Sequence, residues 1–352
     1  MNATWIAPAL AFRRFFAALL TLSAAACLAS CGPPSGGSPA NARIKLEACI
    51  SSATAAQLPI EYAMKKGLFA KHGLDVTITP IDSGSRAVAA LVSGSVQVCQ
   101  IASPAVVNGV AAGADLSIVG GLINSSVYSL MVAEDIRSAA DLKGKAVAVS
   151  TAGSASAISM RMALKALGLD SDHDVTILSV GGQAERMAAL EAGYVVGTLA
   201  DPPESVLTRE RGYHALLDLS TMNVAYQHAG TVTTKAFVAS HRSAVLGYVK
   251  AISEAVFQLK KNREEALAEL SSYLQLDPVK QAAALAETYD VLIKRKFSDI
   301  PYPTVAGVQT LIDEISAQNP DVKRLKAADL ADLSIARELE ESGFFRRLAE
   351  GK

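Results

Sequence analysis

Residues 75–102, DVTITPIDSGSRAVAALVSGSVQVCQIA, are the stretch that decides the fold. The pattern predicts a strand at 75–81, a short helix at 86–92 and a second strand at 96–102, with the turn Ser93-Gly94 before the second strand. A strand, a helix and a second strand in this order imply a parallel sheet with a right-handed crossover.

The same rhythm continues on both sides of this stretch. Further strands are expected at 43–50, 116–123, 146–150, 175–179 and 195–200, and further helices at 55–72, 104–112, 154–167 and 183–192. After about residue 230 the chain becomes mainly helical, with helices expected at 243–274, 278–294 and 305–318. Two successive α/β units therefore predict two lobes, with a ligand cleft at the carboxyl ends of the strands.

Composition narrows the class of protein. Half of the 352 residues are hydrophobic, which is enough for a large core. The 33 basic and 34 acidic residues nearly cancel, and no basic stripe stands out. Because nucleic-acid binders show a concentrated basic surface, we expect no nucleic-acid partner.

The N-terminus has the pattern of an export signal. Arg13 and Arg14 precede an apolar run at 15–28 that is too short to cross a membrane. The run ends in Leu-Ala-Ser-Cys at 28–31, which resembles a bacterial lipobox and predicts lipidation of Cys31. The alternative is an ordinary signal peptide with an incidental cysteine. We expect 1–30 to be a lipoprotein signal peptide, 31–42 a flexible tether, and the protein to be anchored in the periplasm or at the cell surface.

Two further cysteines, Cys49 and Cys99, fall in expected strands. An exported protein can form a disulfide, and this alternative stays open. We expect two buried free thiols, because a bridge across neighbouring parallel strands is sterically awkward. The spacing of cysteines and histidines predicts no metal site.

Small polar residues recur where strands lead into helices. There, free backbone N–H groups and helix N-termini face the predicted cleft and suit a polar or anionic ligand. Plain helix capping is the alternative, since Ser and Thr are favoured at such positions. The candidate ligand-binding residues are Ser52, Ala53, Ser83, Gly84, Ser103, Pro104, Thr151, Gly153, Ser154 and Gln183.

Several short motifs together resemble one known family. In this order and spacing they resemble the periplasmic substrate-binding proteins of ABC importers, in the nitrate, sulfonate, taurine and thiamine-precursor branch (the SsuA/THI5-like and NMT1-like proteins). The motifs are YAMKKGLF at 62–69, GLDV at 73–76, DSG at 82–84, AALVSGSV at 89–96 and DLKGK at 141–145.

The resemblance implies a type II periplasmic-binding-protein fold with two lobes, each a parallel-dominated sheet flanked by helices. Domain I would comprise 43–124 and 230–345, and domain II 125–229. The family's contact loops add Asn124 to the candidate ligand-binding residues. The implied partners are a small-molecule solute and the permease and ATPase subunits of an importer, with a monomeric receptor and no cofactor.

Asp201, before Pro202-Pro203, stands where sulfonate binders of the family resemble one another in an aromatic residue. It is a candidate for holding a cationic or hydroxylated part of the ligand, or alternatively a turn residue. We expect the protein not to be an enzyme, because its sequence contains no hydrolase, nucleotide-binding or metal motif. The alternatives are a pyrimidine-synthase-like enzyme of the same fold and the ligand-binding component of a sensory system.

Overall fold

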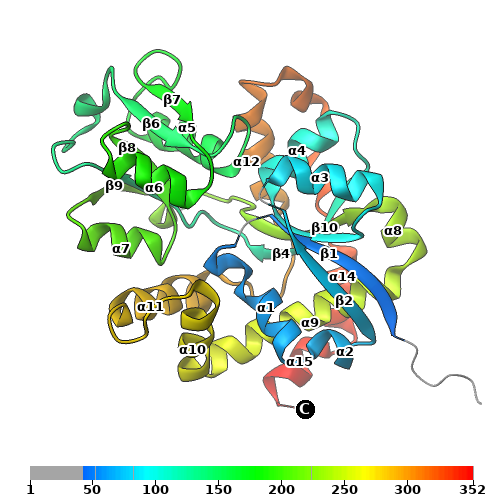
Figure 1. Ribbon diagram of the computed structural model, residues 1–352. Coiled ribbons are helices and arrows are strands. Elements are labelled where there is room, and N and C mark those ends of the chain that lie inside the picture. The colour runs from blue at the N-terminus through cyan, green and yellow to red at the C-terminus, as the bar shows by residue number, and fades with distance from the viewer. Residues whose placement is uncertain (1–42, 52, 82, 223, 352) are drawn as a thin grey trace, which may run out of the picture. The chain divides into compact units, whose positions relative to one another are not determined.

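The computed structural model describes residues 43–351 except 52, 82 and 223 (Figure 1). The predicted signal peptide, the lipidation site Cys31, the tether at 31–42 and Ser52 lie outside the described residues. The described chain contains two five-stranded sheets. None of its helices is long and apolar enough to span a membrane.

The first sheet has the order β2-β1-β3-β10-β4. Its strands are β1 (Ile44–Ile50), β2 (Leu74–Pro80), β3 (Val98–Ala102), β4 (Leu116–Ile123) and β10 (Ala229–Thr234). β1 pairs in parallel with β2 and β3, whereas β10 lies antiparallel between β3 and β4. Four strands therefore run one way and β10 runs against them.

The second sheet repeats this plan in the order β7-β6-β8-β5-β9. Its strands are β5 (Ser129–Val132), β6 (Ala146–Val149), β7 (Thr176–Ser179), β8 (Gly197–Ala200) and β9 (His214–Asp218). β6 pairs in parallel with β7 and β8, and β5 is antiparallel to β8 and β9. The parallel-dominated sheets expected from the sequence are confirmed, each with one opposing strand that the pattern did not predict.

Most helices belong to the first sheet and cover both its faces (Figure 1). They are η1 (Ala55–Gln57), α1 (Leu58–Lys65), α2 (Leu68–Lys71), α3 (Gly84–Ser93), α4 (Ser103–Ala111), α8 (Lys235–Ser240), α9 (Arg242–Lys261), α10 (Arg263–Leu274), α11 (Ala282–Thr288), η4 (Tyr289–Lys296), α12 (Val305–Ser316), η5 (Pro320–Arg324), α13 (Ala327–Leu330), α14 (Ser334–Glu341) and α15 (Phe344–Ala349). We call this sheet with its helices the first lobe.

The second lobe is the second sheet with its own helices. They are η2 (Ala139–Leu142), α5 (Ala155–Ala166), α6 (Gln183–Glu191), α7 (Glu204–Glu210) and η3 (Leu219–Thr221). Leu130, Val147 and Leu199, on three neighbouring strands, are fully buried in its core. The chain crosses from the first sheet to the second after β4 and returns to the first sheet just before β10. We call these two connecting segments the first passage and the returning passage. Each of them adjoins the end of a strand of the first sheet.

Three helices predicted from the sequence are each divided. The helix expected at 55–72 becomes η1, α1 and α2. The helix expected at 243–274 is broken at Asn262, whose backbone is extended and whose side chain accepts a hydrogen bond from Glu265 N at 3.2 Å. Asn at this position caps a new helix and so ends the preceding one. The helix expected at 278–294 becomes α11 followed by the π-helix η4.

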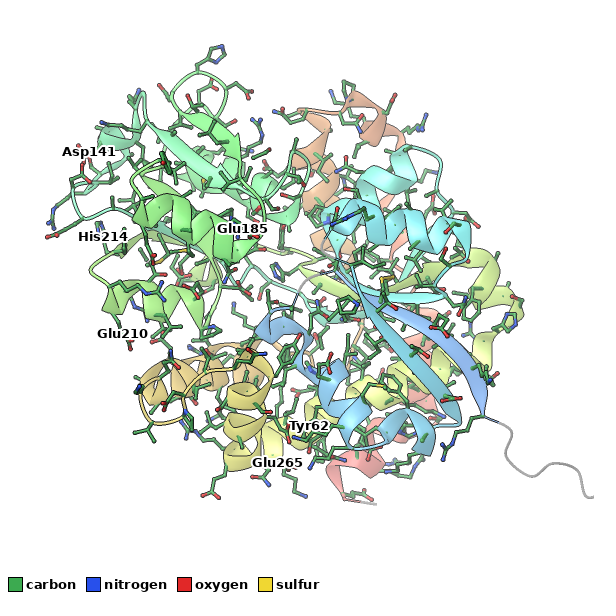
Figure 2. The ribbon with its side chains drawn as sticks, viewed as in Figure 1. Tyr62, Asp141, Glu185, Glu210, His214 and Glu265 are labelled. Carbon is green, nitrogen blue, oxygen red and sulfur yellow. A yellow bond between two sulfur atoms is a disulfide. The ribbon has the colours of Figure 1, made fainter. Side chains whose placement is uncertain are left out.

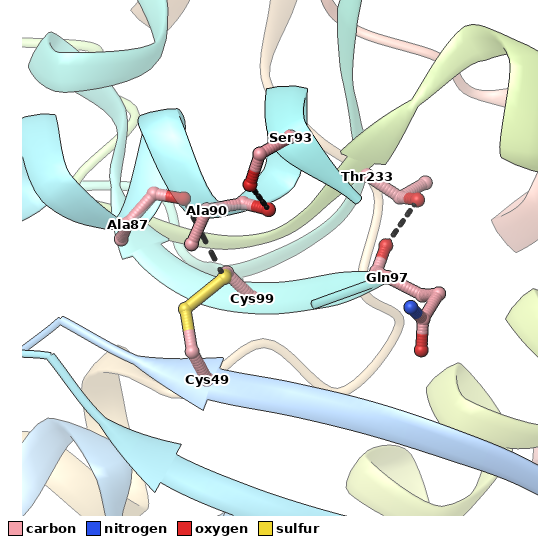
Figure 3. Close-up of a disulfide and its surroundings, with 7 residues drawn as sticks. All are labelled: Cys49, Ala87, Ala90, Ser93, Gln97, Cys99 and Thr233. Atoms are coloured by element: carbon pink, nitrogen blue, oxygen red, sulfur yellow. Dashed lines mark hydrogen bonds between the residues drawn. A yellow bond between two sulfur atoms is a disulfide. The ribbon is translucent and has the colours of Figure 1, made fainter. Parts of the chain in front are cut away.

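Cys49 and Cys99 form a disulfide, so the expectation of two free thiols is wrong (Figure 3). β1 and β3 pair in a register that sets Cys49 opposite Cys99. Their Cα atoms are 4.4 Å apart, at the short end of the range that a disulfide spans. Adjacent strands in register can therefore be bridged where both side chains point to the same face.

Candidate functional site

The predicted site residues differ in how deeply they are buried. Ser103, Pro104 and Asp201 are buried, whereas Ala53 and Thr151 are exposed. The remaining described candidates are half-buried: Ser83, Gly84, Asn124, Gly153, Ser154 and Gln183.

Helix α4, which begins at the predicted residues Ser103 and Pro104, contacts two of the other predicted loops. An added Cβ at Gly84 would lie 2.6 Å from the Cβ of Ala105, so the start of α3 packs directly on α4. From the second lobe, Gly153 O accepts a hydrogen bond from Asn108 Nδ2 at 3.3 Å. Gly153 has φ of +74°, a left-handed conformation that disfavours other residues. The loop before α5 therefore meets α4 across the two lobes.

Two of the helix N-termini in these loops use the serine side chain as a cap. Ser83 accepts a hydrogen bond from Arg86 N at 3.4 Å, and Ser154 accepts one from Ala157 N at 3.2 Å. Both hydroxyls are therefore already engaged by their own helices. The capping alternative holds for these two side chains, and their backbone N–H groups also donate within the protein, Ser83 N to Ile81 O at 2.6 Å and Ser154 N to Thr151 O at 3.2 Å.

Asn124 has a role within the first lobe. Its Nδ2 donates to Tyr302 O at 2.8 Å and to Ser298 Oγ at 3.4 Å. The amide therefore fixes the loop at 298–302 against the end of β4.

Asp201 lies between β8 and α7 and is only 3% exposed. Its Oδ1 has no hydrogen-bond partner among the residues that the structure describes. Burial raises the pKa of Asp201 to about 6, and Arg186 and Gln183 on α6 partly oppose that rise. A buried carboxylate with an unpaired oxygen is costly unless something else satisfies it. Figure 2 labels Glu185 on α6 and Glu210 on α7.

His228 contributes a second unpaired atom from the returning passage, just before β10. It is 5% exposed, and its Nδ1 has no partner within the described part of the chain. Burial lowers the pKa of His228 to about 4, helped by the nearby Lys296 ammonium, so the ring is neutral at physiological pH. Its backbone carbonyl accepts a hydrogen bond from Ser103 N at 3.2 Å. Ser103 Oγ is fully buried and likewise unpaired among the described residues.

Tyr128 connects the two halves of this group. Its ring meets the His228 ring edge-on with centroids 5.1 Å apart. Burial raises the pKa of Tyr128, and the negative charge of Asp201 raises it further. Tyr226 lies 6.0 Å from His228, centroid to centroid, and its hydroxyl is 3.2 Å from Ser159 Oγ on α5. We call Ser103, Tyr128, Asp201 and His228 the polar cluster; both lobes and both passages contribute to it.

Sequence reasoning missed His228 and Tyr128. A single histidine outside any motif carries no signal, and nothing in the local pattern marks His228 as buried. Tyr128 lies on a passage with no predicted element. The one available clue was Gln227-His228, two polar residues directly before a run of small residues that becomes β10.

A cavity in the described chain lies away from these residues, in the first lobe. It has a volume of about 450 Å³ and is lined by α9, α14, α15 and residues 299–300 of the first lobe. Its acids are partnered, because Asp299 binds Lys260 at 2.6 Å and Glu340 accepts from the Tyr302 hydroxyl at 2.7 Å. Over the described residues, no group of three or more His, Cys, Asp or Glu is placed to hold a metal ion.

Comparison with known proteins identifies the family. The family described as NMT1/THI5 like matches residues 55–266, about three fifths of the chain. The chain belongs to the NMT1/THI5-like family. No curated protein sequence matches it significantly.

Several solved structures have the same fold as this chain. The alkanesulfonate-binding protein SsuA from Xanthomonas axonopodis pv. citri, bound to MOPS, is 20% identical with a TM-score of 0.67, covering 83% of this chain and 97% of that one. SsuA from Escherichia coli, an aliphatic sulphonate binding protein, is 20% identical with a TM-score of 0.66, covering 82% and 92%. The nitrate-binding protein NrtA from Synechocystis PCC 6803 is 17% identical with a TM-score of 0.68, covering 86% and 89%. These likenesses confirm the two-lobed periplasmic-binding-protein fold.

Proposed function

We propose that this protein is the solute receptor of an ABC importer, and that it captures a small polar organic solute between its two lobes. The observation that carries the proposal is the polar cluster. Three of its side-chain atoms are unpaired among the described residues, in side chains that are at least 95% buried. Native structures leave few buried polar atoms without partners, and a bound solute would satisfy these.

Closure of two lobes fits this arrangement. Domain I would comprise 43–124 and 230–345 and domain II 125–229, with the passages at their boundaries acting as hinges. A solute that contacts both lobes favours the closed state by the difference between its affinities for the two states. Signal processing at 1–30, lipidation of Cys31, a tether at 31–42 and delivery to permease and ATPase subunits belong to the same proposal. It assigns the protein no catalytic step.

A thermal-shift screen of the purified protein against small organic solutes tests the proposal. A solute present at 100 times its dissociation constant adds about 2.7 kcal/mol to the free energy of unfolding. In a protein of this size that shifts the melting temperature by several degrees. One solute that stabilises the protein and is recovered chemically unchanged supports a receptor. A chemically altered product would contradict it and indicate an enzyme.

A further inference from the structure

The polar cluster offers two hydroxyl groups, a neutral imidazole and one carboxylate, whose unpaired oxygen can only accept hydrogen bonds. We infer that the solute presents a nitrogen hydrogen-bond donor, cationic or amino, to the carboxylate of Asp201, and that the site rejects oxyanions. This inference rests on the proposed function and specifies its ligand chemistry.

The carboxylate of Asp201 makes the first part of the argument. Oδ1 is unpaired among the described residues, and an ionised carboxylate can only accept hydrogen bonds. The charged groups that face it are Arg186 on α6 and Glu204 on α7, with the hydroxyl of Tyr128 and the amide of Gln183 also nearby. An oxyanion placed beside Asp201 would add like-charge repulsion in a desolvated site. A nitrogen donor would instead form a charge-assisted hydrogen bond.

The cations near the cluster are already engaged. Arg186 donates from Nε to Thr198 Oγ1 at 3.1 Å, from Nη1 to Gly181 O at 3.1 Å and from Nη2 to Leu199 O at 3.2 Å. Lys296 Nζ donates to Ser125 Oγ at 3.1 Å and to Ser220 O at 2.8 Å. Neither side chain is held in the manner of an anion clamp, which requires donors directed at the ligand.

His228 is the remaining side chain in or near the cluster that could attract an anion, and it is uncharged. A protonated imidazole would attract an oxyanion, but burial lowers the pKa of His228 to about 4. The neutral ring with its unpaired Nδ1 and the hydroxyl of Ser103 can exchange hydrogen bonds with an uncharged polar group. The solute that fits has a nitrogen donor at one end and an uncharged polar group toward Ser103 and His228.

The N-termini of two nearby helices favour an anion, but their effect is weaker than that of Asp201. α4 begins at Ser103 and α5 follows Ser154, and each carries about half a positive charge at its N-terminus. Asp201 carries a full negative charge at 3% exposure, where screening by water is weak. Arg186, 4% exposed, carries a positive charge beside Asp201, but it donates to Thr198, Gly181 and Leu199. The unpaired Oδ1 of Asp201 is therefore the atom that a donor on the solute satisfies. The solved relatives named for sulfonate and nitrate binding are proteins of this fold whose named ligands carry the opposite charge.

A matched panel of small probes tests the inference. Acetamidine, propylamine and 2-aminopyridine supply nitrogen donors; propanesulfonate, propionate and nitrate supply oxyanions; glycerol is uncharged. The readout is the melting-temperature shift and the dissociation constant for each probe with the whole protein. The variant Asp201→Asn keeps the size of the side chain and removes its charge. Asp135→Asn, at an exposed acid of the second lobe, is the control for net charge.

We expect nitrogen donors to stabilise the wild type and Asp135→Asn, and Asp201→Asn to bind them about 10- to 100-fold more weakly, as the loss of a charged hydrogen bond implies. Should Asp201→Asn be poorly folded, Ser103→Ala tests the other end of the same site and is expected to weaken binding less. Stabilisation by an oxyanion, undiminished in Asp201→Asn, would overturn the ligand chemistry and leave the receptor in place. Silence of every probe would count against the receptor itself.

Acid provides an independent readout. Because the pKa of Asp201 is about 6 and that of His228 about 4, the carboxylate is the group of the polar cluster that changes charge between pH 7 and pH 5. The affinity for acetamidine, which stays cationic throughout, is expected to fall about tenfold over this interval in the wild type and to stay level in Asp201→Asn. An affinity that does not change with pH in the wild type would contradict the role of Asp201.

Discussion

At the scale of single residues, Asp201 and His228 each place a buried side-chain atom where no hydrogen-bond partner reaches it among the described residues. Asp201 was recognisable because it follows an expected strand and precedes Pro202-Pro203. The sequence leaves open whether Asp201 is an exposed turn residue. Asp201 is only 3% exposed, so its carboxylate is not solvated as it would be in an exposed turn. His228 was not recognisable, since only the pairing of β10 between β3 and β4 carries it into the interior.

The free protein is expected to be destabilised by Asp201 at neutral pH. Its pKa in the folded state, about 6, lies above the usual 3.8, so folding favours the protonated form. The free energy of unfolding therefore falls as pH rises from about 4 to about 6 and stays low above that range. We expect Asp201→Asn to raise the free energy of unfolding at pH 7 by about 1–2 kcal/mol and to change it little at pH 4.

Denaturant unfolding at both pH values measures this effect, with Asp135→Asn as the control at an exposed site. A variant that is less stable than the wild type at pH 7 would show that the carboxylate is satisfied within the protein. Residues that are destabilising in the free protein are common at functional sites.

At the scale of elements, the sequence predicts the alternation of strands and helices. Each expected strand is a run of apolar residues, or of apolar and polar residues that alternate. The sequence does not predict the opposing strands. β10 reads AGTVTT, a run of small and hydroxyl residues, and its burial comes from neighbours distant in sequence. β5 has four residues and lies directly after a passage between lobes, where no flanking helix signals it. Long-range pairing, which a local pattern does not contain, creates both strands.

The disulfide belongs to the same scale, because register between β1 and β3 creates it. It closes a loop with a sequence separation of 50 residues. Replacing both cysteines with alanine is expected to lower the free energy of unfolding by about 3–4 kcal/mol. Denaturant unfolding of this variant, and of the wild type under reducing conditions, measures it. Equal stability of the wild type with and without reductant would mean that the bridge does not form in the protein.

At the scale of the whole molecule, the lobes also touch through residues outside the polar cluster. Arg209 on α7 of the second lobe donates to both carboxylate oxygens of Glu287 on α11 of the first, at 2.6 and 2.7 Å. Lys165 on α5 binds Glu314 on α12 at 2.8 Å. Val206 and Leu207 of α7 pack with Ala284 of α11 beside the first pair. These contacts join residues of the two lobes, and we expect them to favour the closed state.

Removing one such pair should weaken solute binding without touching the site. Arg209 and Glu287 are 39% and 41% exposed, so the pair contributes less than about 1 kcal/mol. Arg209→Ala is therefore expected to raise the dissociation constant about two- to fivefold, and added salt to reduce the difference. Arg211→Ala is the control, because Arg211 pairs with Glu191 and Glu204 within the second lobe. An equal effect of the two variants would contradict a role for the contact in closure.

The central claim, that the polar cluster holds a solute between two lobes, is tested most directly by native mass spectrometry. The wild type, Asp201→Asn and Asp135→Asn are incubated with the same mixture of small polar solutes and analysed intact. The account predicts one solute bound at a ratio of one to one and recovered unchanged, in the wild type and Asp135→Asn, and strongly depleted in Asp201→Asn. Equal occupancy in all three proteins would contradict it by placing the solute away from Asp201.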